Sequence, residues 1–219
     1  LNLARPDDRG LLPALFETDD LDPDNDSAIA RMIAGAQIAD LLPRARLLGL
    51  AAAAESEFAH TPTDTPGLLI TQGAAAAPPE NRAPRILDLS ALWAGPLTSH
   101  LMQLAGAEII KIESKGRPDG MRDGDPDFFA LLNQGKASLA LDFYAQEDRA
   151  LLRRLIGAAD IVIEASRPRA LLNLGFDADV IVREQPGLVW LTITAHGSRG
   201  DASEWVGFGD DCGVAAGLS

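Results

Sequence analysis

The sequence predicts an α/β protein, and two observations carry this prediction. From residue 85 onward, short apolar runs alternate with stretches of amphipathic helical pattern. The apolar runs are largely continuous, which is typical of strands that are buried on both faces of a parallel sheet. We therefore expect a mostly parallel sheet with helices on both faces, preceded by a helical N-terminal segment.

Five apolar runs are expected to form the strands of this sheet. They are Ile86–Ser90, Ala107–Glu113, Ser138–Asp142, Asp160–Glu164 and Gly187–Thr194.

The amphipathic stretches between these runs are expected to form the helices. The first, Gly95–Gly106, has Pro96 near its start and a glycine at its end, where helices favour these residues. The longest is Glu147–Ala159, and shorter helices are expected at Asp127–Asn133 and in the segments PRALLNLG and DADVIVREQ. This alternation predicts a Rossmann-like arrangement.

Composition divides the chain near residue 84. Residues 1–60 are expected to form the helical N-terminal segment, because Ile29 and Ile33 fall near one face of a helical pattern. Residues 61–84 are rich in Pro, Ala and Thr and are expected to act as a linker. Residues 85–219 would then form the α/β domain.

Charge and residue usage exclude several classes of protein. The formal net charge of −13 argues against a nucleic-acid partner, since phosphate binding needs clusters of Lys and Arg. The single Cys212 excludes a disulfide framework and a cysteine-based zinc site, so we expect no metal. No apolar run is long enough to span a membrane and the N-terminus shows no secretory signal, so we expect a cytoplasmic protein with no membrane partner. A first residue other than Met suggests a processed or truncated chain.

The turn after the first strand lacks the glycine pattern of a dinucleotide site. It has the sequence SALWAGPLTSHLMQLAG, without G-x-G-x-x-G, and the chain contains no P-loop motif. NAD, FAD and nucleoside triphosphates are therefore disfavoured. A ligand of such a sheet is still expected beyond the carboxyl ends of the strands.

Four segments, in order, resemble one known family. ILDLSALWAGPLTSHLMQLAGAEIIKIES is similar to the opening of family III CoA transferases, which include formyl-CoA transferase, carnitine CoA-transferase and α-methylacyl-CoA racemase. DPDFFALLNQGKASLALDF, ADIVIEASRPRALLNLGFD and QPGLVWLTITAHGSRG resemble three later segments of that family. Residues 26–54 also loosely resemble a stretch near the family's C-terminus, which suggests the end of a preceding family-like half.

The resemblance implies a CoA transferase that moves CoA between carboxylic acids through an aspartyl intermediate. Its substrates would be an acyl-CoA and a small carboxylic acid, and its partner a second copy in a homodimer or a second CoA-transferase-like half. The family's nucleophile falls beyond Ser219, so the catalytic residue is expected outside this chain. The alternative is a non-catalytic CoA-binding or dimerisation half of a larger assembly.

The resemblance also places the family's CoA contacts on particular residues of this chain. By position these are Leu92, Trp93, Ala94, Ser114, Lys115, Leu141, Tyr144, Ala165 and Ser166. Ala165, Ser166 and Tyr144 stand where the family has Asn, an aromatic residue and a basic residue, which indicates a divergent member.

Several of these residues also have a simpler interpretation. Trp93 could pack in the core instead of on CoA, and Lys115 could be a solvated surface residue instead of a phosphate ligand. Asp210 and Asp211 could be catalytic carboxylates or, more commonly for adjacent acids beside Gly, a turn or a helix cap. Lys136 is expected to serve structure or solubility.

Overall fold

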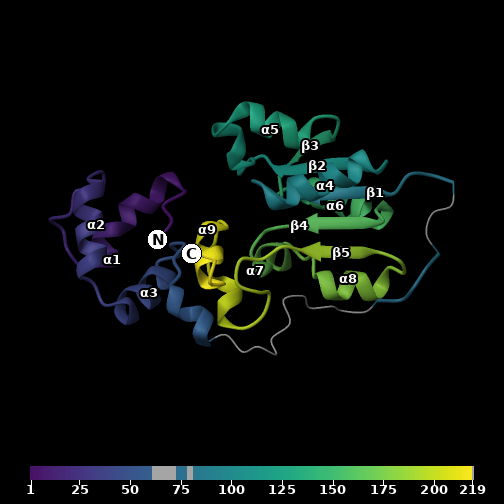
Figure 1. Ribbon diagram of the computed structural model, residues 1–219. Helices are drawn as coiled ribbons and strands as arrows, with labels where there is room; N and C mark the ends of the chain where they lie inside the picture. Colours follow the sequence, from purple (N-terminus) through teal and green to yellow (C-terminus); the bar gives the residue numbers. More distant parts are fainter. Residues whose placement is uncertain (61–72, 78–80, 219) are drawn as a thin grey trace. The chain divides into compact units, whose positions relative to one another are not determined.

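The structure is a computed structural model that describes residues 1–60, 73–77 and 81–218 (Figure 1). The described chain divides into two compact units. One combines residues 1–60 with residues 194–218, and the other contains the described residues from 73 to 193.

The second unit is built on a parallel sheet. Among the described residues the five strands are β1 (Arg85–Leu89), β2 (Glu108–Ser114), β3 (Ala137–Leu141), β4 (Ile161–Glu164) and β5 (Val189–Thr192). They lie in the order β3-β2-β1-β4-β5, and every neighbouring pair is parallel. The predicted mostly parallel α/β sheet is therefore confirmed.

Apolar side chains of the strands point away from both faces of the sheet. In the central strand, Ile86 pairs in register with Ile109 of β2 and Ile161 of β4, so apolar residues line up across neighbouring strands. Leu87 belongs to the core cluster of one face, whereas Ile86 belongs to the cluster of the other. Burial on both faces explains why the strands are continuous apolar runs.

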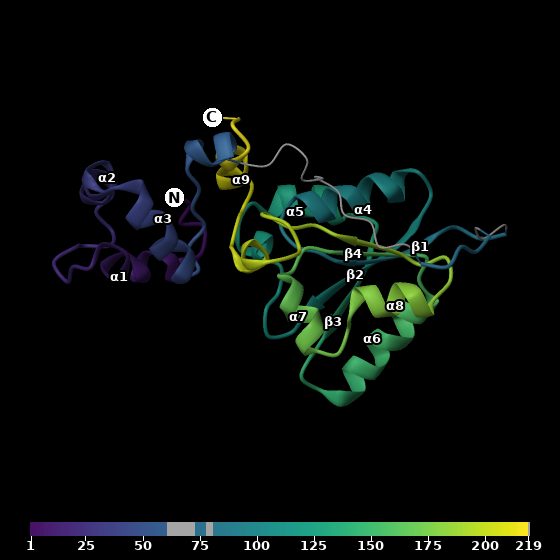
Figure 2. The same cartoon turned by 90° about the horizontal axis from the view of Figure 1, so that it is seen from below.

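Helices cover both faces of the sheet (Figure 2). On one face lie α4 (Ala94–Leu104) and α5 (Pro126–Asn133), the latter preceded by the short η3 (Gly120–Asp123). On the opposite face lie α6 (Gln146–Ala158), α7 (Pro168–Asn173) and α8 (Ala178–Glu184).

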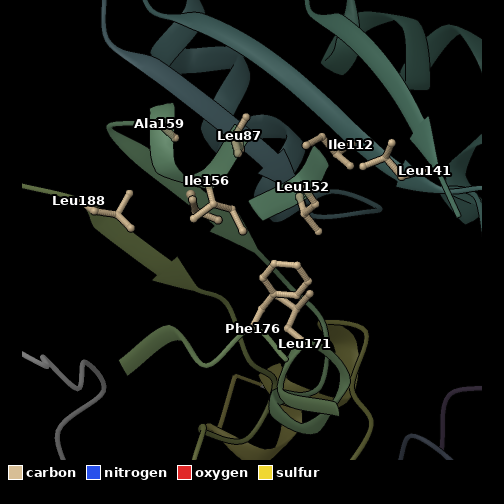
Figure 3. Packing of buried hydrophobic residues seen from close by; sticks show 10 residues of the cluster. Leu87, Ile112, Leu141, Leu152, Ile156, Ala159, Leu171, Phe176 and Leu188 are labelled. Carbon is tan, nitrogen blue, oxygen red and sulfur yellow. The ribbon is translucent and has the colours of Figure 1, made fainter. Parts of the chain in front are cut away.

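The larger core lies between the sheet and α6 to α8 (Figure 3). Leu152 and Ile156 of α6 pack in one cluster with Leu87 and Val162 of the sheet. Phe176, which follows α7, belongs to the same cluster. Each fully buried side chain of this size contributes about 1.5–3 kcal/mol by leaving water. This core holds the strand ends in fixed positions.

The first unit contains short helices from both ends of the described chain. They are η1 (Pro6–Leu11), α1 (Leu12–Phe16), α2 (Asp26–Gly35), α3 (Ile38–Leu47), η2 (Glu55–His60), η4 (Asp201–Glu204) and α9 (Asp210–Ala215). Leu12, Leu15 and Leu50 are fully buried in its core. Ile29 packs there as expected, but Ile33 is 38% exposed, because the buried side of α2 is narrower than the sequence pattern suggests.

The predicted linker is described only in part. Residues 61–72 and 78–80 lie outside the described residues. Within the remainder, the carbonyl of Ala74 accepts a hydrogen bond of 2.9 Å from the N–H of Gly187. This part of the stretch therefore packs beside the residues that lead into β5.

Candidate functional site

The sheet order places a topological switch point between β1 and β4. These strands are neighbours, yet β1 leads into α4 on one face of the sheet and β4 leads towards α7 on the other. In open α/β sheets ligands bind in the crevice outside the carboxyl ends of the strands at such a point. The turn after β1 and the residues after β4 are therefore the first place to look for a ligand site.

The turn after β1 presents an exposed aromatic surface. Leu92, Trp93 and Ala94 are all exposed, and Trp93 is 60% exposed despite its size. Its ring meets that of Phe128 edge-on at 5.4 Å between centroids. Trp93 is therefore not a core residue, and a large exposed aromatic at a switch point is suited to contact a ligand.

Close packing determines how this turn enters α4. A Cβ atom added at Gly95 would lie 2.1 Å from Ser90 Oγ, so a side chain cannot be accommodated there. Glycine at this position lets the first turn of α4 approach the end of β1.

A buried ion pair lies directly beneath the turn. Lys136 Nζ is 3.1 Å from Asp88 Oδ2, and the hydroxyls of Ser90 and Ser99 also donate to the Asp88 carboxylate. Lys136 Nζ also donates to the carbonyl of Pro96 at 2.9 Å. Burial lowers the pKa of Lys136, and the Asp88 carboxylate opposes that shift. The predicted structural role of Lys136 agrees with these contacts, which join β1, α4 and the residues after α5.

A second buried ion pair joins the loop after β2 to the same turn. Lys111 Nζ lies 2.9 Å from Asp119 Oδ2, and the other oxygen of Asp119 accepts the N–H of Leu92 at 2.9 Å. Glu113 Oε2 in turn accepts the N–H of Asp119 at 2.8 Å, and its carboxylate is paired with Arg122. Hydrogen bonding to Arg122 lowers the pKa of Glu113.

These buried charges were not singled out by the sequence analysis. Asp88, Lys111 and Glu113 stand inside apolar strand runs, as LDLS and IIKIE show, and that position was the available signal. Charged residues are almost never fully buried unless they are paired.

The two predicted contacts at the end of β2, Ser114 and Lys115, line a pocket. It has a volume of about 300 Å³ and is lined in part by Ser114, Lys115 and Arg122. Lys115 is exposed and pairs with Asp148 at 3.3 Å. A cation at the rim of a pocket is suited to bind phosphate.

The two remaining contacts at this edge differ in exposure. Tyr144 is 85% exposed, whereas the side chain of Leu141 is buried in the core. The carbonyl of Leu141 accepts the N–H of Lys115. Leu141 therefore supports this edge of the sheet through its backbone and its packing.

The predicted contacts after β4 lie beside a buried carboxyl group. Ala165 is exposed, and Ser166 donates to Glu164 Oε2 from its N–H at 2.9 Å and from its hydroxyl at 2.7 Å. Glu164 is 4% exposed, and burial raises its pKa in spite of these hydrogen bonds. A buried carboxyl group with a raised pKa at a strand end is typical of functional sites, and the sequence analysis did not single it out.

Comparison with known proteins identifies the family. The family model for CoA-transferase family III matches residues 84–219. The chain belongs to this family.

Individual family members show moderate similarity. The chain is 36% identical over 140 residues to the "Probable CoA-transferase Rv1866" of Mycobacterium tuberculosis. This alignment covers 62% of this chain and 18% of that protein. It is 33% identical over 132 residues to the "Succinyl-CoA--D-citramalate CoA-transferase" of Chloroflexus aurantiacus, covering 57% and 33%. The crystal structure of Rv3272 from M. tuberculosis matches with a TM-score of 0.53 and 31% identity, over 61% of this chain and 38% of that one. The matched part of the chain thus covers between 18% and 38% of the length of these three proteins.

Asp211 is one of the two adjacent acids that the sequence leaves open as catalytic carboxylates. Asp211 in the first unit is 4% exposed, and its Oδ1 accepts the N–H of Phe208 at 2.8 Å. Its Oδ2 lies 3.6 Å from His196 Nε2. Phe208 lies just before α9, whose N-cap position is Gly209, so these contacts agree with the interpretation of Asp211 as a residue that holds a turn.

Asp211 also belongs to a group of potential metal ligands. Within the described residues His196, Asp211 and Cys212 form the one group of three His, Cys, Asp or Glu side chains close enough to share an ion. Burial raises the pKa of the Cys212 thiol, which disfavours the thiolate that binds metals.

Among the helices that the structure describes, none combines the length and apolar character needed to cross a membrane.

Proposed function

We propose that this chain supplies the CoA-binding α/β unit of a cytoplasmic family III CoA transferase, which moves CoA between carboxylic acids. The observation that carries the proposal is the exposed turn Leu92–Ala94 at the switch point of a sheet of this family. An acyl-CoA would place its pantetheine arm along this turn and its phosphates towards Lys115. The second substrate would be a small carboxylic acid.

The proposed chemistry proceeds through an aspartyl intermediate. A carboxylate oxygen attacks the thioester carbonyl of the acyl-CoA, forming a mixed anhydride and releasing CoA thiolate. The thiolate then attacks the aspartyl carbonyl of the anhydride, which gives an aspartyl-CoA thioester and the free carboxylic acid. The acceptor acid reverses these two steps and leaves as the new acyl-CoA.

We place the nucleophile outside residues 1–219. Of the described carboxylates nearest the switch point, Asp88 and Asp119 are paired with lysines, and Glu164 is buried and hydrogen-bonded to Ser166. Each already has a structural partner, so none is presented to a bound thioester as a free carboxylate.

The first unit supports a two-half arrangement, with residues 1–60 as the end of a preceding half, 61–84 as the linker and 85–219 as the start of the next half. Residues 1–60 and 194–218 share one compact unit, in which the Arg46 guanidinium lies 3.6 Å from the centroid of the Trp205 ring. A match of 140 residues is 18% of Rv1866, whereas a match of 132 residues is 33% of the citramalate enzyme. Rv1866 is therefore nearly twice as long, as a protein of two halves would be.

A non-catalytic CoA-binding or dimerisation half is the second proposal. It is favoured by Ser166, which replaces an aromatic residue of the family and whose hydroxyl is used within the protein to bond Glu164. A second copy of the chain in a homodimer could supply the missing contacts in place of a fused half.

The test is CoA binding by residues 1–219. A ligand that binds the native state alone stabilises it by mass action, so millimolar CoA should raise the melting temperature. Dephospho-CoA, which lacks the 3′-phosphate, should give a smaller rise if Lys115 contacts phosphate. No rise with CoA would overturn the proposal.

The placement of the nucleophile has its own test. We expect no exchange of labelled CoA between two carboxylates by this chain alone, and robust exchange would contradict that placement.

A further inference from the structure

Leu92, in the middle of the exposed turn, has a left-handed backbone. Its φ is 67°, and apart from Glu17 it is the only non-glycine residue with a positive φ in the described part of the chain. This region is costly for a residue with a Cβ, and such strain persists only where the surroundings enforce it. Leu92 is 36% exposed, so its side chain is not locked in a core.

The Asp119 carboxylate is positioned to enforce this conformation. Its Oδ1 accepts the N–H of Leu92 at 2.9 Å, and its Oδ2 lies 2.9 Å from Lys111 Nζ. Lys111 Nζ also donates to the carbonyl of Ser90 at 3.0 Å. The buried pair therefore holds the backbone at two positions, Leu92 and Ser90.

Asp119 is itself held in place. Its N–H donates to Glu113 Oε2 at 2.8 Å, and its Oδ1 also accepts the N–H of Met121 at 3.0 Å. The side chains of Asp119 and Lys111 are 0% and 2% exposed, so water does not compete for these bonds. The carboxylate is a rigid anchor on the loop after β2, and it acts on a turn that follows β1.

We propose that Asp119, supported by Lys111, is a positioning residue that holds the turn Leu92–Ala94 in the conformation that binds CoA. This inference rests on the proposed function, because it assigns the turn to CoA. Without the anchor, Leu92 relaxes to a right-handed or extended conformation and Trp93 turns away from the ligand. The cost of ordering the turn is then added to the cost of binding CoA.

The test is a double-mutant cycle on CoA affinity, measured by calorimetry, with Asp119→Ala in two backgrounds. In the native background we expect D119A to weaken CoA binding by about tenfold, the cost of one enforced left-handed residue. In the L92G background the left-handed conformation is no longer strained, and we expect D119A to weaken binding by less than about threefold. The cycle cancels any contact that the Leu92 side chain itself makes with CoA. Equal losses in both backgrounds, or no loss in either, would overturn the proposal.

A matched control and a conservative variant keep the result interpretable. Asp123→Ala, an exposed acid of the same loop, is expected to leave CoA affinity unchanged. If D119A does not fold, D119N takes its place, because its amide is a weaker acceptor for the Leu92 N–H and presents an NH₂ group towards Lys111. The same pattern across the two Leu92 backgrounds is then expected, with a smaller loss, and its absence would refute the role of Asp119.

A spectroscopic readout separates this inference from the proposed function. In protein labelled with 5-fluorotryptophan, the ¹⁹F resonance of Trp93, assigned with W93F, should shift in D119A and not in D123A, whether or not CoA binds. If the native chain binds no CoA, the proposed function fails while this shift still reports on the anchor. If CoA binds and neither its affinity nor the Trp93 resonance responds to D119A, the inference fails alone.

Discussion

Lys136 Nζ lies 3.1 Å from Asp88 Oδ2, and the two side chains are 1% and 0% exposed. Asp88 is in the central strand and Lys136 follows α5, so the pair joins the sheet to the layer of helices that covers it. Removing one partner of a buried pair leaves an uncompensated charge in a medium of low polarity, which is the costly event.

The first prediction is that Lys136→Met destabilises the protein by about 3–5 kcal/mol, because it leaves the buried Asp88 carboxylate without its ion-pair partner. The matched control is Lys115→Met, which breaks an exposed pair with Asp148 and should change stability by about 0–1 kcal/mol. Urea unfolding followed by circular dichroism measures both. Adding Asp88→Asn to K136M should recover part of the loss, since it removes the stranded charge. Similar losses for K136M and K115M would contradict the prediction.

The fold could be predicted because its signals are local, whereas the pairing of the buried charges depends on residues far apart in the sequence. Continuous apolar runs identify buried strands wherever they occur, and Pro96 and Gly106 mark the ends of a helix. The lysine at Lys136 has the same local signature whether it is solvated or buried, because its partner Asp88 is 48 residues away.

Local sequence patterns also could not predict the geometry of the candidate site. Leucine disfavours a positive φ, so no propensity predicts the turn at Leu92, which Asp119 holds from 27 residues away. The position of the switch point follows from the order of strands, which alternation of strands and helices does not determine. The resemblance to the family supplied the residues of the turn, and the structure supplies the reason for their exposure.

The second prediction concerns the pH dependence of stability through Glu164. Burial raises its folded-state pKa above the ordinary value of 4.5, so its contribution to stability is complete below that value and is lost as pH rises through the folded-state pKa. Glu164→Gln removes this loss. The melting temperature of E164Q minus that of the native protein should therefore increase from about pH 4 to pH 8.

Glu108→Gln is the control for this measurement. Glu108 is 66% exposed at the start of β2, and water screens its contact with Arg85 at 3.7 Å, so the corresponding difference should change much less than that for E164Q. A constant difference for E164Q as well would show that the Glu164 carboxyl is not perturbed in the folded protein.

The third prediction separates binding from stability at Trp93. Its ring is 60% exposed and meets Phe128 edge-on, an arrangement worth about 0.5–1.5 kcal/mol, so Trp93→Ala should lower stability only slightly. If CoA lies along the turn, the same change should weaken CoA binding by about tenfold or more, as loss of an exposed aromatic anchor does. Leu104→Ala, at the far end of the helix α4 that follows Trp93, is the control: Leu104 is 72% exposed, and its loss should leave CoA affinity unchanged. A W93A protein with native CoA affinity would remove Trp93 from the site.

The fourth prediction concerns the contact between residues 1–60 and 194–218. Arg46 lies over the Trp205 ring at 3.6 Å and is also paired with Glu57, and α9 packs against η2. If a protease recognition sequence is inserted between residues 61 and 72 and cut, we expect the N-terminal fragment to remain bound and to co-elute with the rest of the chain in size-exclusion chromatography. A stacked Arg and Trp pair contributes about 0.5–2 kcal/mol, so Arg46→Ala should weaken this association measurably.

Arg9→Ala is the control for this association, because the described partners of Arg9, Pro23 and Asp26, lie in the same fragment as Arg9 itself. Its fragment should stay bound as in the native protein. The two-half proposal requires this association, since the end of one half can dock on the next only if its contacts hold without a covalent link. Release of the native N-terminal fragment immediately after cleavage would show that residues 1–60 are retained by the chain connection alone, and the two-half proposal would then be wrong.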